Sequence, residues 1–580
     1  MLDQKRLIDR LPLAAKGFRK IIRQGLFYVD KTALVYEIAR NSHPKFLSRP
    51  RRFGKSTLVS TLEELFVHGV KAHDGVESCF KGLAMEKLWH DNGTYHVLHL
   101  NFRLLDRNAH GAESFKGNFA KALDDFALQC GITLREQDIT AADKFLYVLS
   151  KLPDYSVVLL ADEYDAPLTR CMQSGSKQDV DEIVKTLQDF YAVVKDLDDR
   201  FRCVFITGIT RYKDTYLFTA GNSITDISQQ RLFGTVCGYT REEIKHTFGE
   251  LLSLAAMTHY GLSLQEALRE EAKERMLDEL ALWYDGYCFD EEGATSVFST
   301  WSVLQFFASA SNLFDVYWYD AAGVPAVIRN KFRKCDYVQM LEELNVGKPI
   351  TVTRDVFINP SSLDSMEPHV LLFQTGYLTL AEGYKGVHLL SPTVKLDYPN
   401  TEIRKAFSDM LHDVFLPEGV LGDRYRNGNG RANPEFVAAL QRRDLDTVMN
   451  IINGYFRTVD YEGETINKEV TATAFMSFFI RDLLAQLPLS NRHQSTGKPD
   501  LAFDYGQLRI IIENKFVSKE EGASEEKIAA ALKKAQEQIK ERHYGETVDT
   551  AEPCRLQLWR IATVYSARKR ELVSWADADG

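Results

Sequence analysis

The chain of 580 residues is long enough for two to four domains with sizeable cores, and its 45% of hydrophobic residues is typical of a globular protein. A net charge of −10 excludes a generally basic chain, so contact with nucleic acid would need local clusters of Lys and Arg. The eight cysteines are scattered without a CxxC pair, and there is neither a signal peptide nor an apolar run near the ~18 residues of a membrane helix, so we expect a cytoplasmic protein with free thiols and no membrane contact.

A phosphate-binding loop is the first functional pattern along the chain. The run PKFL (44–47) predicts a short strand, and LSRPRRFGKSTLVSTL (47–62) leads from it into an amphipathic helix. Backbone N–H groups at such a helix start bind phosphates, the lysine meets the β- and γ-phosphate charge, and the serine hydroxyl binds Mg²⁺. The usual spacing has glycine at position 49, where this chain has Arg49 followed by Pro50, which lacks an N–H. The residues that we expect to bind nucleotide are Arg52, Phe53, Gly54, Lys55, Ser56 and Thr57.

The run SVVLLADEYDAP (156–167) is the expected partner of this loop. Val157 to Ala161 predict a buried parallel strand, with Asp162 and Glu163 at its carboxyl end. In phosphate-loop ATPases this placement lets the aspartate hold Mg²⁺ and the glutamate orient water. Capping of the next helix by Asp162 is the alternative, but two motifs that each follow a strand favour the ATPase. A third strand at 203–208 ends in polar residues that either sense the γ-phosphate or form a turn: Thr207, Thr210 and Arg211.

The middle of the chain is predominantly helical in pattern. From Tyr239, TREEIKHTFGELLSLA predicts a helix, with Thr240 and Glu243 forming a capping box at its start. Helical patterns dominate to about 345, and residues 346–400 mix short strands with Pro and Gly turns. After a helical connector, RNGNGRANP (426–434) is the most loop-like segment and a candidate hinge.

The C-terminal segment carries a second functional pattern in GKPDLAFDYGQLRIIIENKF. Asp500 precedes one apolar run, and Glu513 and Lys515 close the next. Side chains at i and i+2 of a strand share a face, so Glu513 and Lys515 project together, and a fold-back of the Asp500 run adds a second carboxylate. Two carboxylates bind a hard cation such as Mg²⁺, which with the lysine can polarise a phosphodiester and its attacking water. The alternative is an edge strand with solvated charges.

Six runs of the sequence together resemble a known family: FYVDKTALV, FLSRPRRFGKSTLVSTL, VVLLADEYDAPL, VFITGITRY, LLFQTGYLTL and YPNTEIRKAF. The family is that of bacterial AAA-ATPase-like proteins with a C-terminal PD-(D/E)XK nuclease-superfamily domain, and the similarity extends from about residue 5 to about residue 575. The arginine-rich loop RPRRFGKS without its first glycine is typical of this family. The resemblance implies an ATP-binding N-terminal domain and a Mg²⁺-dependent, nuclease-like C-terminal domain.

Matched position by position, the resemblance assigns ATPase roles to Lys55, Ser56, Asp162 and Glu163, and nuclease roles to Asp500, Glu513 and Lys515. Gln538, in KKAQEQIKERHY, matches a further polar position on the helix after the Glu-x-Lys strand. Glu469, on the helix before it, is either a third acidic metal ligand or a first-turn carboxylate that interacts with the helix dipole.

The expected fold class is α/β, in four segments. They are a phosphate-loop NTPase sheet domain (1–235), a helical lid region (236–345), a mixed α/β connector with the hinge (346–455) and a restriction-endonuclease-like nuclease domain (456–580). The expected cofactors are ATP and Mg²⁺, for which Mn²⁺ can substitute. Nucleic acid is the expected substrate, with DNA favoured over RNA. The sequence does not decide whether the protein forms a homo-oligomer or binds a partner protein.

An ATP-driven or ATP-gated nuclease is the favoured function, since Asp500, Glu513 and Lys515 are all present. One alternative is an ATP-switched regulatory or nucleic-acid-binding module whose nuclease fold is catalytically silent. The other is a small-molecule kinase with an unrelated tail, which lacks an evident acceptor-binding feature.

Overall fold

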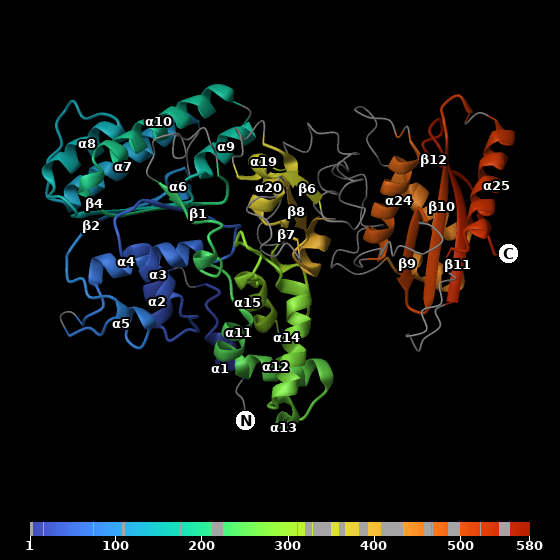
Figure 1. Ribbon diagram of the computed structural model, residues 1–580, viewed down its shortest axis with the longest axis horizontal. Helices are drawn as coiled ribbons and strands as arrows, with labels where there is room; N and C mark the ends of the chain where they lie inside the picture. Colours follow the sequence, from blue (N-terminus) through green and yellow to red (C-terminus); the bar gives the residue numbers. More distant parts are fainter. Residues whose placement is uncertain are drawn as a thin grey trace. The chain divides into compact units, whose positions relative to one another are not determined.

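A computed structural model (Figure 1) describes the following residues: 4–14, 17–72, 75–106, 111–174, 176–211, 224–309, 311–318, 328, 350–358, 366–381, 393–407, 433–457, 466, 468–484, 499–521, 524–544 and 557–579. The chain divides into two compact units. The N-terminal unit is Met1–Lys331 with Thr351–Ile403, and the C-terminal unit is Phe332–Ile350 with Arg404–Gly580. Among the helices within the described residues, none has both the length and the apolar character to cross a membrane.

A five-stranded parallel sheet is the centre of the first half of the N-terminal unit. In spatial order its strands are β2 (His96–Asn101), β3 (Val157–Asp162), β4 (Phe201–Gly208), β1 (Lys45–Ser48) and β5 (Thr225–Asp226). Each neighbouring pair is parallel. β3 is buried along its whole length, as its continuous apolar run predicts. Because these strands are parallel, the two predicted ATPase motifs lie at the same ends of their strands, the carboxyl ends. Only β4 separates β1 from β3, so the two motifs are close to each other.

Helices cover both faces of this sheet (Figure 1). One layer contains α2 (Phe18–Arg23), α3 (Thr32–Ala39), α4 (Lys55–His68) and α5 (Ala84–Leu88). The other contains α6 (Phe102–Leu105), α7 (Ala112–Gln129), α8 (Ala141–Lys151), α9 (Ala166–Ser174) and α10 (Lys177–Asp196). Aromatic rings fill this second layer, where Phe190 lies 4.8 Å from Phe145 and 4.9 Å from Phe119 between ring centroids.

A helical region, formed by the first helix of the chain and by helices after β5, accompanies the sheet. It consists of α1 (Gln4–Asp9), α11 (Arg241–Thr247), α12 (Gly249–Tyr260), α13 (Leu264–Ala267), α14 (Glu270–Tyr284) and α15 (Thr300–Ala308). The predicted capping box of Thr240 and Glu243 is confirmed, but the helix that it starts is interrupted at Phe248. Phe248, Leu252 and Leu280 belong to the apolar core that joins these helices.

A small sheet, which apart from Ile350 belongs to the N-terminal unit, has the order β6 (Ile350–Thr353), β8 (Thr393–Asp397) and β7 (Thr379–Leu380). Two short helices accompany it, α19 (Arg354–Ile358) and α20 (Pro368–Thr375). A helical segment at 401–407 then leads into the C-terminal unit.

The C-terminal unit contains a mixed four-stranded sheet with the order β12 (Glu571–Asp577), β11 (Gln557–Ser566), β10 (Leu508–Val517) and β9 (Leu501–Tyr505). Its helices are α22 (Pro434–Arg442), α23 (Leu445–Phe456), α24 (Glu469–Leu484) and α25 (Glu525–Glu541). β10 and β11 are parallel and are joined through α25, while both outer pairs are antiparallel. Figure 1 shows α24 and α25 on opposite sides of the sheet.

The C-terminal unit also contains α22 and α23, which lie before or reach only to residue 456. It therefore begins earlier than the nuclease-like domain expected from the sequence, 456–580. Asn453 of α23 exchanges hydrogen bonds with the backbone of Leu572 in β12, its Nδ2 donating at 2.9 Å and its Oδ1 accepting at 2.8 Å. Residues 426–432 of the candidate hinge lie outside the described residues, and Asn433 and Pro434 cap and begin α22. The six described cysteines are free, as expected: Cys79, Cys130, Cys171, Cys203, Cys237 and Cys288.

Candidate active sites

The predicted phosphate loop connects the end of β1 to the start of α4. Its backbone is left-handed at Arg52 (φ 69°) and at Gly54 (φ 93°), which is the N-cap of α4. A Cβ at position 54 would meet nothing within 4 Å, so the backbone and not a neighbour requires glycine. The first backbone bond of the helix runs from the Leu58 N–H to the Gly54 carbonyl. The N–H groups before Leu58 therefore lack intrahelical partners and suit an anion.

Lys55 is buried at the start of α4, with its ammonium group inside the loop. Nζ donates to the carbonyls of Arg49 and Pro50, both at 2.8 Å. Burial lowers the pKa of Lys55, and the nearby Glu163 and Asp162 partly offset this effect. Within the described part of the chain the hydrogen-bond partners of Lys55 are neutral carbonyls, which an arriving phosphate would replace with charged oxygens.

Asp162, at the end of β3, has the features of a cation ligand. Its Oδ2 accepts a hydrogen bond from Ser56 Oγ at 2.9 Å and lies 3.5 Å from Asn101 Nδ2. Its Oδ1 is buried and has no hydrogen-bond partner among the described residues. A buried, unpartnered carboxylate oxygen is costly, and Mg²⁺ held by carboxylate and hydroxyl oxygens would remove that cost. The capping alternative is wrong, because α9 begins only at Ala166.

Glu163 directly follows in a left-handed conformation, φ 53°, that non-glycine residues rarely adopt. Burial raises the pKa of its carboxyl group, against the effect of Lys55. Its Oε1 lies 3.9 Å from Nη1 of Arg103, a residue whose side chain is 78% exposed. A carboxyl group that has a raised pKa and, among the described residues, one long ionic contact suits a group that accepts a proton or a hydrogen bond from water.

The sequence does not predict the two residues of β2 and α6 at this site, Asn101 and Arg103. Asn101 pairs with Asp162 across the sheet. The only signal is a polar residue at the end of the apolar run HVLHLN, and that signal acquires meaning only when β2 is known to lie beside β3.

Arg49, which replaces the usual glycine, has a structural role. Its guanidinium is 1% exposed and donates to the carbonyls of Ser228 and Phe233 at 2.6 and 2.8 Å. It also lies 4.4 Å from the centroid of the Phe289 ring. Burial lowers the pKa of Arg49 to about 10. Arg49 thus links the loop to neighbouring backbone segments of the N-terminal unit. The residues left for phosphate binding are those of the second half of the loop, from Phe53 onward.

The hydroxyl groups at the end of β4 are occupied by structural bonds. Thr207 Oγ1 donates to the Leu47 carbonyl at 2.8 Å, and Thr210 Oγ1 donates to Asp165 Oδ2 at 2.6 Å. Arg211 forms an ion pair with Asp226 at 3.3 Å. These contacts favour the turn over the γ-phosphate sensor.

The C-terminal candidate site lies at the end of β10, a central strand. β9 runs antiparallel to it, with Leu501 opposite Ile512, and β11 runs parallel on its other side. This fold-back brings Asp500 to the site, where its Oδ2 accepts a hydrogen bond from the Asn514 N–H at 2.8 Å. Glu513 is 0% and Lys515 7% exposed. The alternative of an edge strand with solvated charges is therefore wrong.

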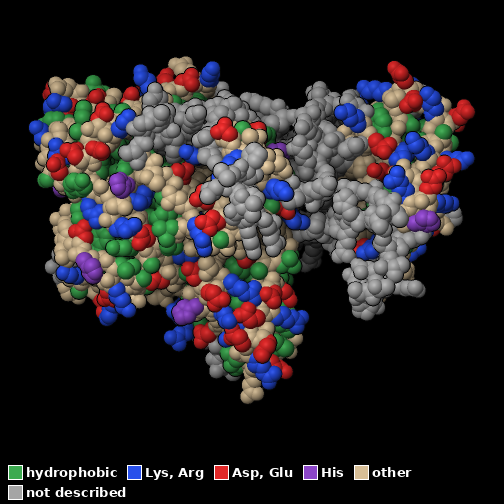
Figure 2. All heavy atoms as spheres, viewed as in Figure 1, with side chains coloured by type: hydrophobic (Ala, Val, Ile, Leu, Met, Phe, Trp, Pro, Cys, Tyr) green, Lys and Arg blue, Asp and Glu red, His purple; other side chains and the backbone are tan. Residues whose placement is uncertain are grey.

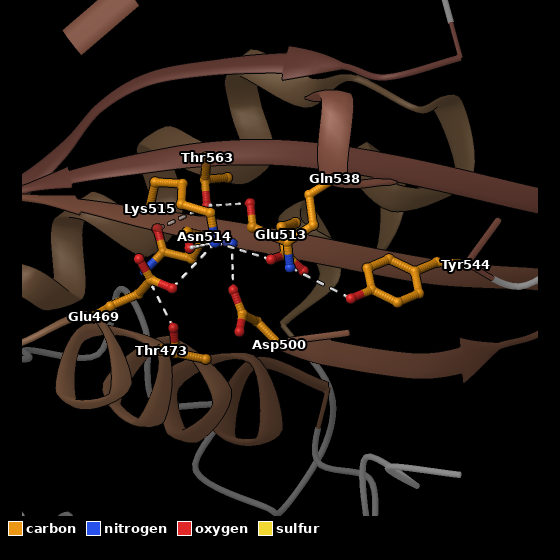
Figure 3. A network of polar contacts seen from close by, with 9 residues as sticks. All are labelled: Glu469, Thr473, Asp500, Glu513, Asn514, Lys515, Gln538, Tyr544 and Thr563. Atoms are coloured by element: carbon orange, nitrogen blue, oxygen red, sulfur yellow. Dashed lines mark hydrogen bonds and ion pairs between the residues drawn. The ribbon is translucent and has the colours of Figure 1, made fainter. Parts of the chain in front are cut away.

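Lys515 joins the acidic side chains of this site (Figure 3). Its Nζ donates to Glu513 Oε1 at 2.9 Å and to Glu469 Oε1 at 3.1 Å. Burial lowers the pKa of Lys515, but the bonds and charges of Glu513, Asp500 and Glu469 outweigh it and raise the pKa overall. Burial and the Glu513 charge raise the pKa of Asp500, and burial raises that of Glu513 against the effect of Lys515.

Two carboxylates of this site suit a divalent cation. Glu513 Oε2 is buried without a hydrogen-bond partner among the described residues, as is Asp162 Oδ1. With Asp500 it offers oxygen ligands to a hard cation. Glu469 is the first residue of α24 and contacts the lysine, with 40% of its side chain exposed. Within the described residues no group of three or more His, Cys, Asp or Glu is arranged to hold a metal.

Gln538 reaches from α25 toward the same region (Figure 3), and its Nε2 donates to the Tyr544 hydroxyl at 3.4 Å. Asn514 is a residue that the sequence does not single out. It is fully buried, accepts a hydrogen bond from Thr563 Oγ1 at 2.9 Å and donates to Thr473 Oγ1 at 3.2 Å. An asparagine in an apolar strand is the only signal, and its partners lie far away in the sequence.

Comparison with known proteins bears on the first of these sites. Residues 12–218 match the model of a family described as predicted AAA-ATPase. The match contains the phosphate loop and β3, so this part of the chain is similar to a predicted AAA-ATPase domain. The chain is also similar to the uncharacterized protein in the vnfD 5′ region of Azotobacter chroococcum mcd 1. The two are 28% identical over 418 residues, which is 70% of this chain and 71% of the relative. The family match ends before the C-terminal site.

Proposed function

We propose that the N-terminal domain binds and hydrolyses ATP with Mg²⁺, and that the C-terminal unit is a metal-dependent nuclease under nucleotide control. One repeated arrangement carries this proposal. At each site a buried lysine lies near a carboxylate that has one bonded oxygen and one buried, unpartnered oxygen. A lysine and a carboxylate-bound cation together match a phosphate group.

At the N-terminal site, ATP would be bound by groups of this chain. Lys55 and the N–H groups of the first turn of α4 would bind its phosphates. Ser56 and Asp162 would hold Mg²⁺, which supplies charge neutralisation at the phosphate oxygens. Glu163 orients the attacking water and accepts a hydrogen bond from it.

At the C-terminal site, Asp500 and Glu513 would hold Mg²⁺ or Mn²⁺, which supplies electrostatic activation of the phosphodiester and of water. Lys515 binds the scissile phosphate, since its contacts with Glu513 and Glu469 keep it charged. Glu469 positions this lysine, and Gln538 is a further polar contact from α25.

Nucleic acid is the proposed substrate, with DNA favoured. The surface over α25 in Figure 2 mixes both signs of charge. Exposed basic residues alternate there with acidic ones: Lys533, Lys534, Glu537, Lys540, Glu541 and Arg542. This mixture is the observation that favours the second candidate, an ATP-switched regulatory module with a catalytically silent nuclease fold, because strong binding of a polyanion needs a basic surface.

Incubation of the full-length protein with single- and double-stranded DNA and RNA, with Mg²⁺ or Mn²⁺ and with or without ATP, tests the proposal. Wild type should cleave at least one substrate, and Lys515→Ala should lose cleavage. Lys519→Ala, a change of an exposed lysine close by, should retain it. Equal cleavage by wild type and Lys515→Ala contradicts the assigned site. Absence of cleavage by wild type under every condition favours the regulatory module.

A further inference from the structure

Five consecutive carbonyl groups of the phosphate loop, from Arg49 to Phe53, are each bonded to a donor outside the sheet. Lys55 Nζ donates to the first two. The other three donors come from the helical region: Trp318 Nε1 donates to Arg51 at 3.0 Å, Thr300 Oγ1 donates to Arg52 at 2.6 Å, and the Gly238 N–H donates to Phe53 at 3.1 Å. The loop is therefore held by its carbonyl groups, while the N–H groups from Lys55 to Thr57, which precede the first backbone bond of α4, suit an anion.

The donor from Trp318 is fixed in place by a buried carboxylate. Glu402 is 0% exposed and accepts hydrogen bonds from the Trp318 N–H and from Ser302 Oγ, both at 2.7 Å. The Trp318 side chain is 1% exposed and packs edge-to-face on Tyr377, with 5.2 Å between ring centroids. The indole thus has little freedom to leave the Arg51 carbonyl.

Gly376 packs against the phosphate loop at Pro50, next to the residue whose carbonyl Trp318 holds. Its φ is +93°, and a Cβ there would lie 2.7 Å from Cβ of Pro50. Gly376 and Glu402 belong to the runs LLFQTGYLTL and YPNTEIRKAF, which are far from the loop in sequence. Both runs therefore act on the phosphate loop, one by packing on Pro50 and the other through Trp318.

This support matters because the loop begins with Arg49 and Pro50. Glycine would let the backbone turn freely, whereas proline has a fixed φ and no N–H. Contacts from outside the loop must therefore set its conformation. All the donors from the helical region, and Glu402, follow residue 218, where the AAA-ATPase-like match ends.

We propose that Trp318, held by Glu402, is a positioning residue for nucleotide: its indole N–H holds the Arg51 carbonyl away from the phosphates and keeps the loop N–H groups directed at the β-phosphate. The inference rests on the proposed ATP-binding function. It follows that the nucleotide site is complete only when the helical region is present. The β-phosphate is common to ATP and ADP and absent from AMP. Loss of the hydrogen bond from Trp318 to Arg51 should therefore weaken the binding of ATP and ADP and leave the affinity for AMP unchanged.

Trp318→Phe in the full chain tests the proposal, because it keeps an aromatic ring and removes only the indole N–H. The matched control is Trp283→Phe in α14, whose ring packs on Phe314 with 5.5 Å between ring centroids. Affinities for ATP and ADP with Mg²⁺ are measured by calorimetry, and that for AMP by competition. An unpaired polar group left by the change predicts about tenfold weaker binding of both ATP and ADP, with AMP unchanged. The control should bind all three as wild type does.

A second variant, Glu402→Leu, removes the oxygen that accepts from the Trp318 N–H and should weaken ATP and ADP in the same pattern by a smaller factor, which keeps the test valid if Trp318→Phe does not fold. Wild-type affinity for ATP and ADP in both variants would overturn the inference while leaving the proposed ATP binding intact. An equal loss for all three nucleotides would also overturn it, because that result indicates general damage. If wild type itself binds neither ATP nor ADP, the proposed function fails and this inference fails with it.

Discussion

Lys55 and Lys515 are both buried, yet their surroundings shift their pKa values in opposite directions. The bonded partners of Lys55 are neutral carbonyls, so burial dominates and the pKa falls. Lys515 is bonded to two carboxylates, which outweigh burial, and its pKa rises. Lys55 is thus arranged to gain from an arriving polyanion. The charge of Lys515 is already balanced by its ion pairs with Glu513 and Glu469. A cation that binds Glu513 would weaken the first of these ion pairs, and the ammonium group could then bind a phosphate.

Lys55→Ala should weaken ATP binding strongly, because the phosphates lose the buried lysine of the loop. A charge-assisted bond of this kind corresponds to a loss of roughly 100-fold in affinity by calorimetry. Lys71→Ala, a change of an exposed lysine, is the matched control and should bind ATP as wild type does. Unchanged affinity in Lys55→Ala would contradict the assigned nucleotide site.

Glu163→Gln should separate binding from hydrolysis. The amide keeps the shape of the side chain, so ATP affinity should be retained, while ATP turnover should fall by at least about 100-fold because the group that orients water has lost its charge. Phosphate release under single-turnover conditions measures this. Equal turnover in the two proteins would show that Glu163 is not that group.

Mn²⁺ binding at the C-terminal site should strengthen as pH rises from 6 to 8. The pKa values of Asp500 and Glu513 are raised, so protons compete with the cation at low pH, and raising pH frees the carboxylates. Calorimetry should show weaker binding and a flatter pH profile for Asp500→Ala. Lys515→Ala should bind Mn²⁺ as well as wild type or slightly better, because a neighbouring positive charge is gone. A pH-independent affinity in wild type would refute this account.

At the scale of elements, Asn514 connects β10 to two neighbours, α24 through Thr473 and β11 through Thr563. Asn514→Ala leaves both hydroxyls without this buried partner. It should lower the free energy of unfolding of the C-terminal unit by about 1–3 kcal/mol. Urea unfolding measures the change, and Gln507→Ala, at an exposed position in the turn before β10, should have little effect. A loss as small as that of the control would mean that the bridge adds no stability.

Glu402 connects the helical segment 401–407 to α15 and to Trp318, and burial raises its pKa to about 8. The folded protein therefore keeps a proton that the unfolded chain, with its ordinary pKa near 4.5, has released. Stability of the N-terminal unit should fall as pH rises from about 5 to 8, by a few kcal/mol at most, and then level off. Glu402→Gln, which imitates the protonated acid, should remove this component. Parallel pH profiles of thermal unfolding in the two proteins would contradict it.

At the scale of the whole molecule, the two candidate sites belong to different compact units, and one of the places where the chain passes from one unit to the other is the helical segment 401–407. Its first half bears Glu402, which acts on the phosphate loop through Trp318. Its second half belongs to the C-terminal unit. Nucleotide control of cleavage requires that the two nucleotide states differ in free energy at some such element.

A fragment of residues 433–580 should cleave nucleic acid without any response to ATP, whereas the full chain should respond. The fragment begins at Asn433 because α22 and α23 belong to the C-terminal unit and Asn453 bonds to β12. Cleavage rates with and without ATP measure the difference for each protein. The same ATP dependence in both would argue against control by the N-terminal domain.

The sequence alone determined the features that depend on neighbours along the chain. Apolar runs defined β3 and the strand before the phosphate loop, and the alternation of side chains in β10 placed Glu513 and Lys515 together. The capping box at Thr240 is also local. These follow from backbone periodicity and turn chemistry, which act within a few residues.

Only the tertiary structure decided which distant residues meet. It placed Asn101 beside Asp162, because strand order is not encoded in any one strand. It made Glu469 a partner of Lys515, although the sequence left its role open. It also brought Trp318 and Glu402 to a phosphate loop whose own sequence lacks the first glycine. Such contacts depend on how separate elements pack, and residue patterns within one element carry no record of that packing.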